Sequence, residues 1–112
     1  MNIEIFFKSL EGAYSENTIR SYRCDYSHYA TWCQKYQYDP FNIHEDKFAD
    51  YILQMGGNLT VATIQRRVAS LSSIFNLTKS TNPTKEPVVI LTFKKTSKKI
   101  WKTSKTSNTS NL

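Results

Sequence analysis

Two long stretches of this sequence repeat apolar residues at alternating intervals of three and four positions. A turn of α-helix takes about 3.6 residues, so this interval places such residues on one stripe of a helix. We therefore predict amphipathic helices over residues 16–36 and 61–77, each with its stripe in the core. The stripes are Ile19, Tyr22, Tyr26, Tyr29, Cys33 and Tyr36 in the first helix, and Val61, Ile64, Val68, Leu71 and Phe75 in the second.

Residues that start and stop helices flank these stretches. Ser15 and Thr60 stand where a hydroxyl accepts the free backbone N–H groups of a first turn. The Asp39–Pro40 pair closes the first stretch, because the residue before a proline resists helical geometry. Residues 56–58, Gly-Gly-Asn, are expected to end a helix over 45–55 with a left-handed residue. That helix is predicted to bury Phe48, Ile52 and Met55 and to expose Glu45, Asp46 and Asp50.

The two ends of the chain complete the expected fold. Residues 2–10 predict one or two helical turns that end at Gly12. The apolar run 88–93 fits a buried strand as well as a buried helix, but a single strand would lack a partner, so we predict a helix over 85–97. Lys, Ser, Thr and Asn dominate the remaining residues, which favours disorder. The predicted fold class is all-α, a bundle of four or five helices over residues 1–99 with a disordered basic tail over 100–112.

Length and charge narrow the class of protein. The 112 residues suit one small domain, and the net charge of +6 is unevenly spread. Residues 1–60 carry five basic against eight acidic residues, and residues 61–112 carry ten against one. This asymmetry favours a polyanionic partner.

Targeting signals and cysteine chemistry set the expected compartment. The sequence has no apolar run of about 20 residues and no signal-peptide pattern, so we expect no membrane association. Cys24 and Cys33 share the predicted helix 16–36 on opposite faces, too far apart to form a disulfide. A cytoplasmic location is the resulting expectation.

The polar faces opposite the stripes point to a partner. A solvated helix face usually pairs Glu with Lys, but residues 61–77 contain no acidic residue. Short polar side chains around an arginine let a helix approach a phosphate backbone or a groove wall. They also suit packing against another helix or a partner protein, and this alternative stays open. The predicted outward residues are Arg20, Ser21, Cys24, Ser27, His28, Thr31 and Lys35 in the first helix, and Ala62, Thr63, Arg66, Ala69, Ser70 and Ser73 in the second, with Arg67 at the border.

A run of lysines follows, and catalytic motifs are absent from the sequence. Lys94, Lys95, Lys98, Lys99, Lys102 and Lys105 have no acidic neighbour, and they suit phosphate binding or a solubilising tail. The sequence has no Gly-rich phosphate loop and no GxSxG motif. Cys24 and His28 are spaced as two metal ligands can be, but a structural zinc site needs about two more. We predict no metal, no cofactor and no catalytic residue.

Five short motifs occur in order along the chain. Residues 15–26 (SENTIRSYRCDY) are similar to the pattern S-x-x-T-x-x-x-Y-x-x-D, and residues 29–33 (YATWC) to the aromatic stretch that follows it. Residues 48–53 (FADYIL), 59–71 (LTVATIQRRVASL) and 82–83 (NP) continue the series. Together they cover about residues 5–99, and they resemble the core-binding, or SAM-like, domain of tyrosine recombinases (phage integrases).

The resemblance implies a four-helix domain that forms half of a C-shaped clamp around duplex DNA, with helices 16–36 and 61–77 in the major groove. The matching positions are Thr18, Arg20, Ser21, Cys24 and Ser27 in the first helix and Thr63, Arg66, Arg67 and Ser70 in the second. Lys94, Lys95, Lys98 and Lys99 fall at the linker that leads to the family's catalytic domain, and we expect them to bind phosphates.

The resemblance also bears on activity. The chain stops where the family's catalytic domain should begin, so we expect a chain that binds double-stranded DNA without cutting it. In isolation it should be a monomer, and the missing catalytic domain of the parent recombinase would be its partner. The alternative is a helical protein-interaction module with a basic tether.

Overall fold

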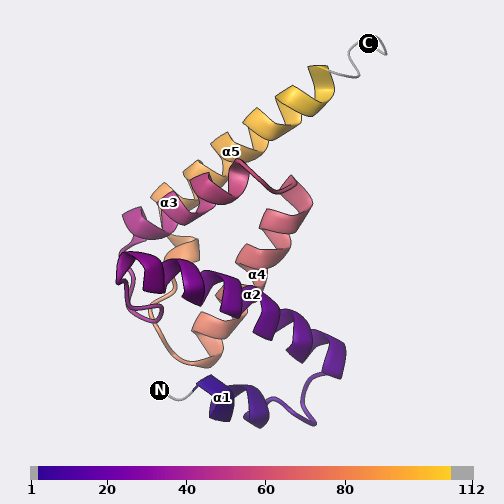
Figure 1. Cartoon of the computed structure of the whole chain (residues 1–112), viewed down its shortest axis with the longest axis vertical. Coiled ribbons are helices and arrows are strands. Elements are labelled where there is room, and N and C mark those ends of the chain that lie inside the picture. Colours follow the sequence, from indigo (N-terminus) through magenta and orange to yellow (C-terminus); the bar gives the residue numbers. More distant parts are fainter. Residues whose placement is uncertain (1–2, 107–112) are drawn as a thin grey trace.

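Residues 3–106 fold into five α-helices and one short 3-10 helix (Figure 1). The computed structural model describes the backbone of residues 3–106 and the side chains of residues 3–98. The elements are α1 (Ile3–Ser9), α2 (Glu16–Tyr36), α3 (Glu45–Gly56), α4 (Val61–Leu77), η1 (Pro83–Lys85) and α5 (Pro87–Thr106). No strand occurs within the described part, so the predicted all-α fold class is confirmed and the apolar run 88–93 is helical.

α2, α3 and α4 begin at the residues that the sequence predicted, and α5 begins at Pro87, two residues later than predicted. The Ser15 hydroxyl accepts the Thr18 backbone N–H at 3.1 Å, and the Thr60 hydroxyl accepts that of Thr63 at 3.2 Å. Gln37 caps the end of α2. It adopts a left-handed conformation with φ of 61° and precedes the Asp39–Pro40 pair.

The end of α3 differs from the prediction. Gly57 caps the helix with φ of −79°, and neither Gly56 nor Asn58 has a positive φ, so a left-handed residue in 56–58 was the wrong expectation. A glycine is needed here for packing instead. A Cβ on Gly56 would collide with Cγ2 of Thr96 on α5. α3 and α5 lie side by side (Figure 1), and this contact sets how closely they approach.

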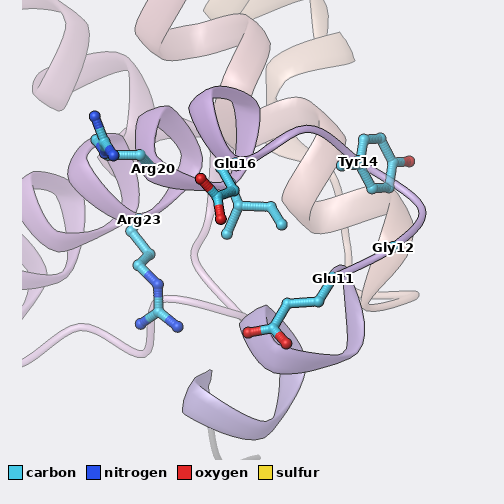
Figure 2. Close-up of a pocket in the computed structure, with 7 residues that line it drawn as sticks. Glu11, Gly12, Tyr14, Glu16, Arg20 and Arg23 are labelled. Carbon is cyan, nitrogen blue, oxygen red and sulfur yellow. The ribbon is translucent and has the colours of Figure 1, made fainter.

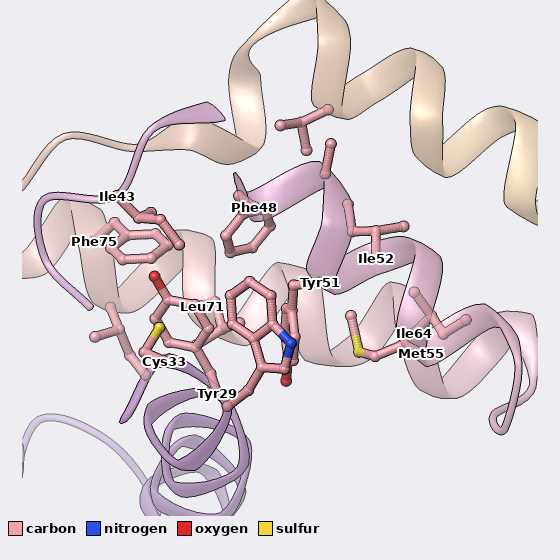
Figure 3. Close-up of a cluster of buried hydrophobic side chains, with 14 of the residues drawn as sticks. Tyr29, Cys33, Ile43, Phe48, Tyr51, Ile52, Met55, Ile64, Leu71 and Phe75 are labelled. Carbon is pink, nitrogen blue, oxygen red and sulfur yellow. The ribbon is translucent and has the colours of Figure 1, made fainter. Parts of the chain in front are cut away.

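Tyr29 of α2 lies at the centre of the core (Figure 3). Its ring centroid is 5.4 Å from that of Tyr51, 5.6 Å from that of Phe48 and 5.8 Å from that of Phe75. The Tyr29 hydroxyl donates to the Pro40 carbonyl oxygen at 2.8 Å. α2, α3 and α4 therefore meet around one buried aromatic residue whose polar atom has a partner.

α1 is fastened to the N-terminal half of α2. Phe7 is buried, with its ring 6.0 Å from that of Tyr26. Arg23 reaches back from α2, and its Nη1 lies 2.6 Å from Glu4 Oε2. The Arg23 guanidinium also stands 4.9 Å from the centre of the Phe7 ring. Apolar packing, an exposed ion pair and a cation–π contact thus join this first helix to α2.

α5 is longer than predicted. The helix runs to Thr106 and not to residue 97, so residues 100–106, expected within a disordered tail, are helical. Once a helix has formed, each added residue costs little, and lysine is a good helix former, so a polar composition does not end it. Residues 107–112 of the predicted tail lie outside the described residues. The last turns of α5 extend beyond the other helices in Figure 1.

Candidate nucleic-acid interface

α2 and α4 pack against each other, and a buried carboxylate joins them. Asp25 of α2 has no exposed surface. Its Oδ1 accepts a hydrogen bond from Arg66 Nη2 at 3.0 Å and lies 3.6 Å from Arg67 Nε. These three residues are called the Asp25 cluster below. A carboxylate that is shielded from water requires positively charged partners, and α4 supplies two of them.

The two arginines of the Asp25 cluster have opposite environments. The Arg66 side chain is 56% exposed, whereas that of Arg67 is 10% exposed. Arg67 Nη1 points to the thioether of Met55 on α3, at 3.9 Å from Sδ. One carboxylate faces two guanidinium groups, so the cluster has a net charge of +1. The exposed member, Arg66, presents that positive charge to solvent.

A second polar pair borders the Asp25 cluster. His28 Nδ1 and the Tyr51 hydroxyl are 2.8 Å apart and link α2 to α3. Partial burial and the Arg67 charge lower the pKa of His28, and Asp25 acts in the opposite direction. Burial raises the pKa of Tyr51, and Arg67 opposes that shift. The lowered pKa favours the neutral form of His28 more than that of an ordinary histidine, whose pKa is about 6.5.

The structure separates the predicted contact residues by exposure. On α2, Arg20, Cys24 and Ser27 are exposed, and Thr18 and Ser21 are half-buried. On α4, Arg66 is exposed and Thr63 is half-buried.

Two predicted outward residues of α4 are buried. Arg67 is 8% and Ser70 is 6% exposed, so placing Ser70 on the outward face, and Arg67 at its border, was wrong. The cause is a rotation of the buried stripe. Arg67 pairs with Asp25, and it shares a side of the helix with Ile64, Leu71 and Ile74, all fully buried. Val61 and Val68, predicted as core, are only partly buried.

The buried side of α2 is also rotated from the prediction. Tyr36, expected in the core stripe, is 41% exposed, and Trp32 is buried in its place. Asp25 was missed as a site residue. Its one sequence signal was its place in the motif of residues 15–26, because an acidic residue on a helix otherwise indicates the solvent side.

Hydroxyls among the predicted contacts already have partners. Thr18 Oγ1 accepts from the Ser15 hydroxyl at 2.9 Å, and the Thr63 and Thr60 hydroxyl oxygens are also 2.9 Å apart. Both threonines thus belong to helix caps. They hold the first turns of α2 and α4 in place, next to the side chains that face solvent.

A groove of about 620 Å³ runs between α2 and α3. Cys24 and Ser27, two of the predicted contacts, stand on its α2 side with His28. Trp32, Tyr51, Met55 and Leu59 supply apolar lining, and Thr31, Lys35, Gln54 and Asn58 add polar atoms. The α3 residues of this groove were not predicted, because periodicity along one helix does not show which helix lies beside it.

Arg20 lines a different cavity, at the start of α2 (Figure 2). This cavity has a volume of about 390 Å³, and its charged residues are Arg20, Arg23, Glu11 and Glu16. Arg23 is paired with Glu4. Two acidic residues so close to the arginines make the cavity itself a poor anion site.

The predicted phosphate-binding lysines lie on another part of the fold. Lys94, Lys95 and Lys98 are exposed on α5, the helix that packs along α3. The side chain of Lys99 lies outside those described. The lysines are thus on a different helix pair from the Asp25 cluster, which belongs to α2 and α4.

The described residues lack a membrane-spanning helix and a cluster of metal ligands. No helix in that part of the chain is both long and apolar enough to span a membrane. Within residues 3–98, no three His, Cys, Asp or Glu side chains come together as metal ligands do.

Residues 3–82 match the family described as phage integrase, N-terminal SAM-like domain. An integrase/recombinase XerD homolog from Selenomonas ruminantium is 28% identical to this chain over 65 residues. That alignment covers 58% of the chain and 19% of the relative, so the match spans about a fifth of the longer protein.

Proposed function

Since this chain belongs to the family of phage integrase N-terminal SAM-like domains, we propose that it binds duplex DNA as the N-terminal part of a site-specific tyrosine recombinase. The name of its relative, an integrase/recombinase, supports a role in DNA recombination. The proposed partner is double-stranded DNA, and the proposed location is the cytoplasm.

The distribution of exposed charge carries this proposal. α2 and α4 pack together, and the residues they expose include Arg20 and Arg66 among short side chains. α4 contains no acidic residue. The exposed acidic side chains of Asp46 and Asp50 are on α3, and on α2 the exposed Glu16 is confined to the first turn. Helices that combine arginine with short side chains can approach a polyanion closely.

Different residues take different parts in this proposal. Arg66, on the net-positive Asp25 cluster, reaches a phosphate or the edge of a guanine. Arg20, Ser21, Cys24 and Ser27 contact the same duplex from α2, and Thr18 and Thr63 hold the first turns of α2 and α4 beside it. Lys94, Lys95, Lys98 and Lys99 neutralise phosphates, and each phosphate neutralised adds about 0.9 to the steepness of the salt dependence. Arg67 and Ser70 are buried, so they act from within the fold.

The proposal assigns binding, and not strand cleavage, to the described helices. The matched family is an N-terminal domain, and the alignment covers 19% of the recombinase relative. We infer that a separate catalytic domain of the parent protein cuts and rejoins the DNA. In isolation, the chain described here is then a DNA-binding monomer.

Amide chemical-shift mapping with a mixed-sequence duplex tests the proposal. We expect shifts concentrated in residues 20–31 and 62–73, strong at about 50 mM salt and weak at about 200 mM. Shifts confined to residues 94–98 would reduce the DNA contact to the basic helix. No salt-sensitive shift at all would contradict DNA binding and favour the helical protein-interaction module.

A further inference from the structure

Arg66 is held at one end and free at the other. Its Nη2 donates to Asp25 Oδ1 at 3.0 Å, and its side chain is still 56% exposed. A guanidinium carries five N–H donors, so this single bond leaves most of them available. The bond fixes where the free donors lie relative to α2, the helix that carries Asp25.

Arg67 makes that arrangement possible without consuming the charge of Arg66. Asp25 is fully buried, and a lone buried carboxylate would hold an arginine only by neutralising it. Arg67, at 3.6 Å from the same Oδ1 and itself buried, supplies the compensating charge. Arg66 therefore keeps a positive charge for an outside anion while its side chain is restrained.

We propose that Asp25 is a positioning residue that orients the Arg66 guanidinium toward DNA at the junction of α2 and α4, with Arg67 as the buried counter-charge. The proposal rests on the proposed function, since it names the residue that prepares one of its DNA contacts. Restraint before binding lowers the entropy lost when a long side chain is immobilised in a complex.

The decisive variant removes the restraint and keeps the charge. Asp25→Leu together with Arg67→Met removes the acceptor of the Arg66 hydrogen bond and one negative and one positive charge, so the cluster retains its net +1 on Arg66. Replacing a buried ion pair by neutral side chains of similar size is often tolerated. Overlay of the amide spectrum on that of the wild type shows whether the fold is kept.

Binding of a mixed-sequence duplex gives the first measurement. We expect the double variant to bind about three- to tenfold more weakly than the wild type, with the same salt slope. Arg66→Ala should bind more weakly and also lose about 0.9 from the magnitude of the salt slope. Adding Asp25→Leu and Arg67→Met to Arg66→Ala should cause no further loss. Wild-type affinity in the double variant, or losses that simply add, would overturn the proposal.

Nitrogen relaxation of the Arg66 Nε–H group gives a second measurement that needs no DNA. We expect this group to be ordered in the free wild-type chain and mobile in the double variant. Equal mobility in both would overturn the positioning role even if DNA binds. An ordered Arg66 in a wild-type chain that shows no salt-dependent DNA binding would instead contradict the proposed function and leave the restraint itself in place.

Arg66→Lys keeps the proposal testable if the double variant does not fold. This change leaves the buried Asp25–Arg67 pair intact and keeps the charge. An ammonium group does not reproduce the planar fork that lets a guanidinium bond Asp25 and an outside anion together. We expect the same three- to tenfold loss of affinity at an unchanged salt slope. Binding equal to the wild type would contradict the proposal.

Discussion

The two cysteines of α2 have opposite environments although one helix carries both. Cys24 is exposed beside the α2–α3 groove, and Cys33 is buried against Tyr29. Burial raises the pKa of the Cys33 thiol to about 11. Since the thiolate is the reactive form, Cys33 is protected from modification both because it is buried and because its thiol stays protonated.

Alkylation at neutral pH should therefore distinguish the two thiols. We expect iodoacetamide to modify Cys24 in the native protein and Cys33 only after unfolding. Excess duplex DNA at low salt should slow the reaction of Cys24, because the proposed contact covers α2. Peptide mass spectrometry locates the label, and Cys33 serves as the internal control. A Cys24 rate that saturating duplex leaves unchanged would contradict contact at this position.

Prediction from the sequence also failed at single positions, where it assigned residues of α4 to the wrong side of the helix. The series Ile64, Arg67, Leu71 and Ile74 has the same spacing of three and four as the stripe that was predicted. This series was not recognised as the buried side because it contains an arginine. A charged residue indicates the solvent side of a helix unless its partner is known. That partner, Asp25, is on another helix, and helical periodicity carries no information about such pairs.

At the scale of helices, prediction was more accurate. α2 and α4 match their predicted ranges, since both starts have a hydroxyl cap and the apolar spacing persists throughout. Contacts between helices could not be predicted in the same way. Gly56 was interpreted as a turn residue, and only the packed structure shows that Thr96 of α5 requires it.

Substitution at Gly56 should measure the contact between α3 and α5. We expect Gly56→Ala to lower the free energy of unfolding by about 1–3 kcal/mol, because the new Cβ meets Thr96 and close-packed helices resist added atoms. Gly57→Ala is the matched control, since its Cβ would lie 3.6 Å from the Gln54 carbonyl oxygen, an ordinary contact. Urea unfolding provides the measurement.

A second substitution identifies the atom responsible. Thr96→Ala removes the methyl group that the new Cβ meets, so adding it to Gly56→Ala should restore part of the lost stability. Equal stability of Gly56→Ala and Gly57→Ala, or no recovery on adding Thr96→Ala, would show that α3 and α5 adjust their spacing freely.

For the whole molecule, the charge asymmetry of the sequence does not divide the fold into an acidic and a basic half. α2 comes from the acidic part of the sequence, yet it contributes Arg20 and packs on the basic α4. The Asp25 cluster joins one residue from the first part with two from the second. Net charge thus indicates a polyanionic partner, and the packing determines which surface can face it.

Two single variants, each lacking one positive charge on a different helix, distinguish the effect of a particular surface from the effect of net charge. Lys47 lies on α3, with its amine 5.9 Å from the centre of the Tyr38 ring, and Arg20 lies on α2. We expect Arg20→Gln to weaken binding of duplex DNA and to reduce the salt slope by about 0.9, while Lys47→Gln changes little. Fluorescence anisotropy at several salt concentrations checks this. Equal losses would mean that DNA responds to total charge and not to a particular face.

The contact of Gly56 with Thr96 also affects where the far end of α5 lies. α5 continues for ten residues beyond Thr96, which at about 1.5 Å per residue is a lever arm of roughly 15 Å. A tilt of α5 against α3 of about 10° would displace the end of this arm by about 2.6 Å, which is the arm length multiplied by the sine of the tilt. The contact of Gly56 with Thr96 thereby sets the direction in which α5 carries the chain as far as Thr106, the end of that helix.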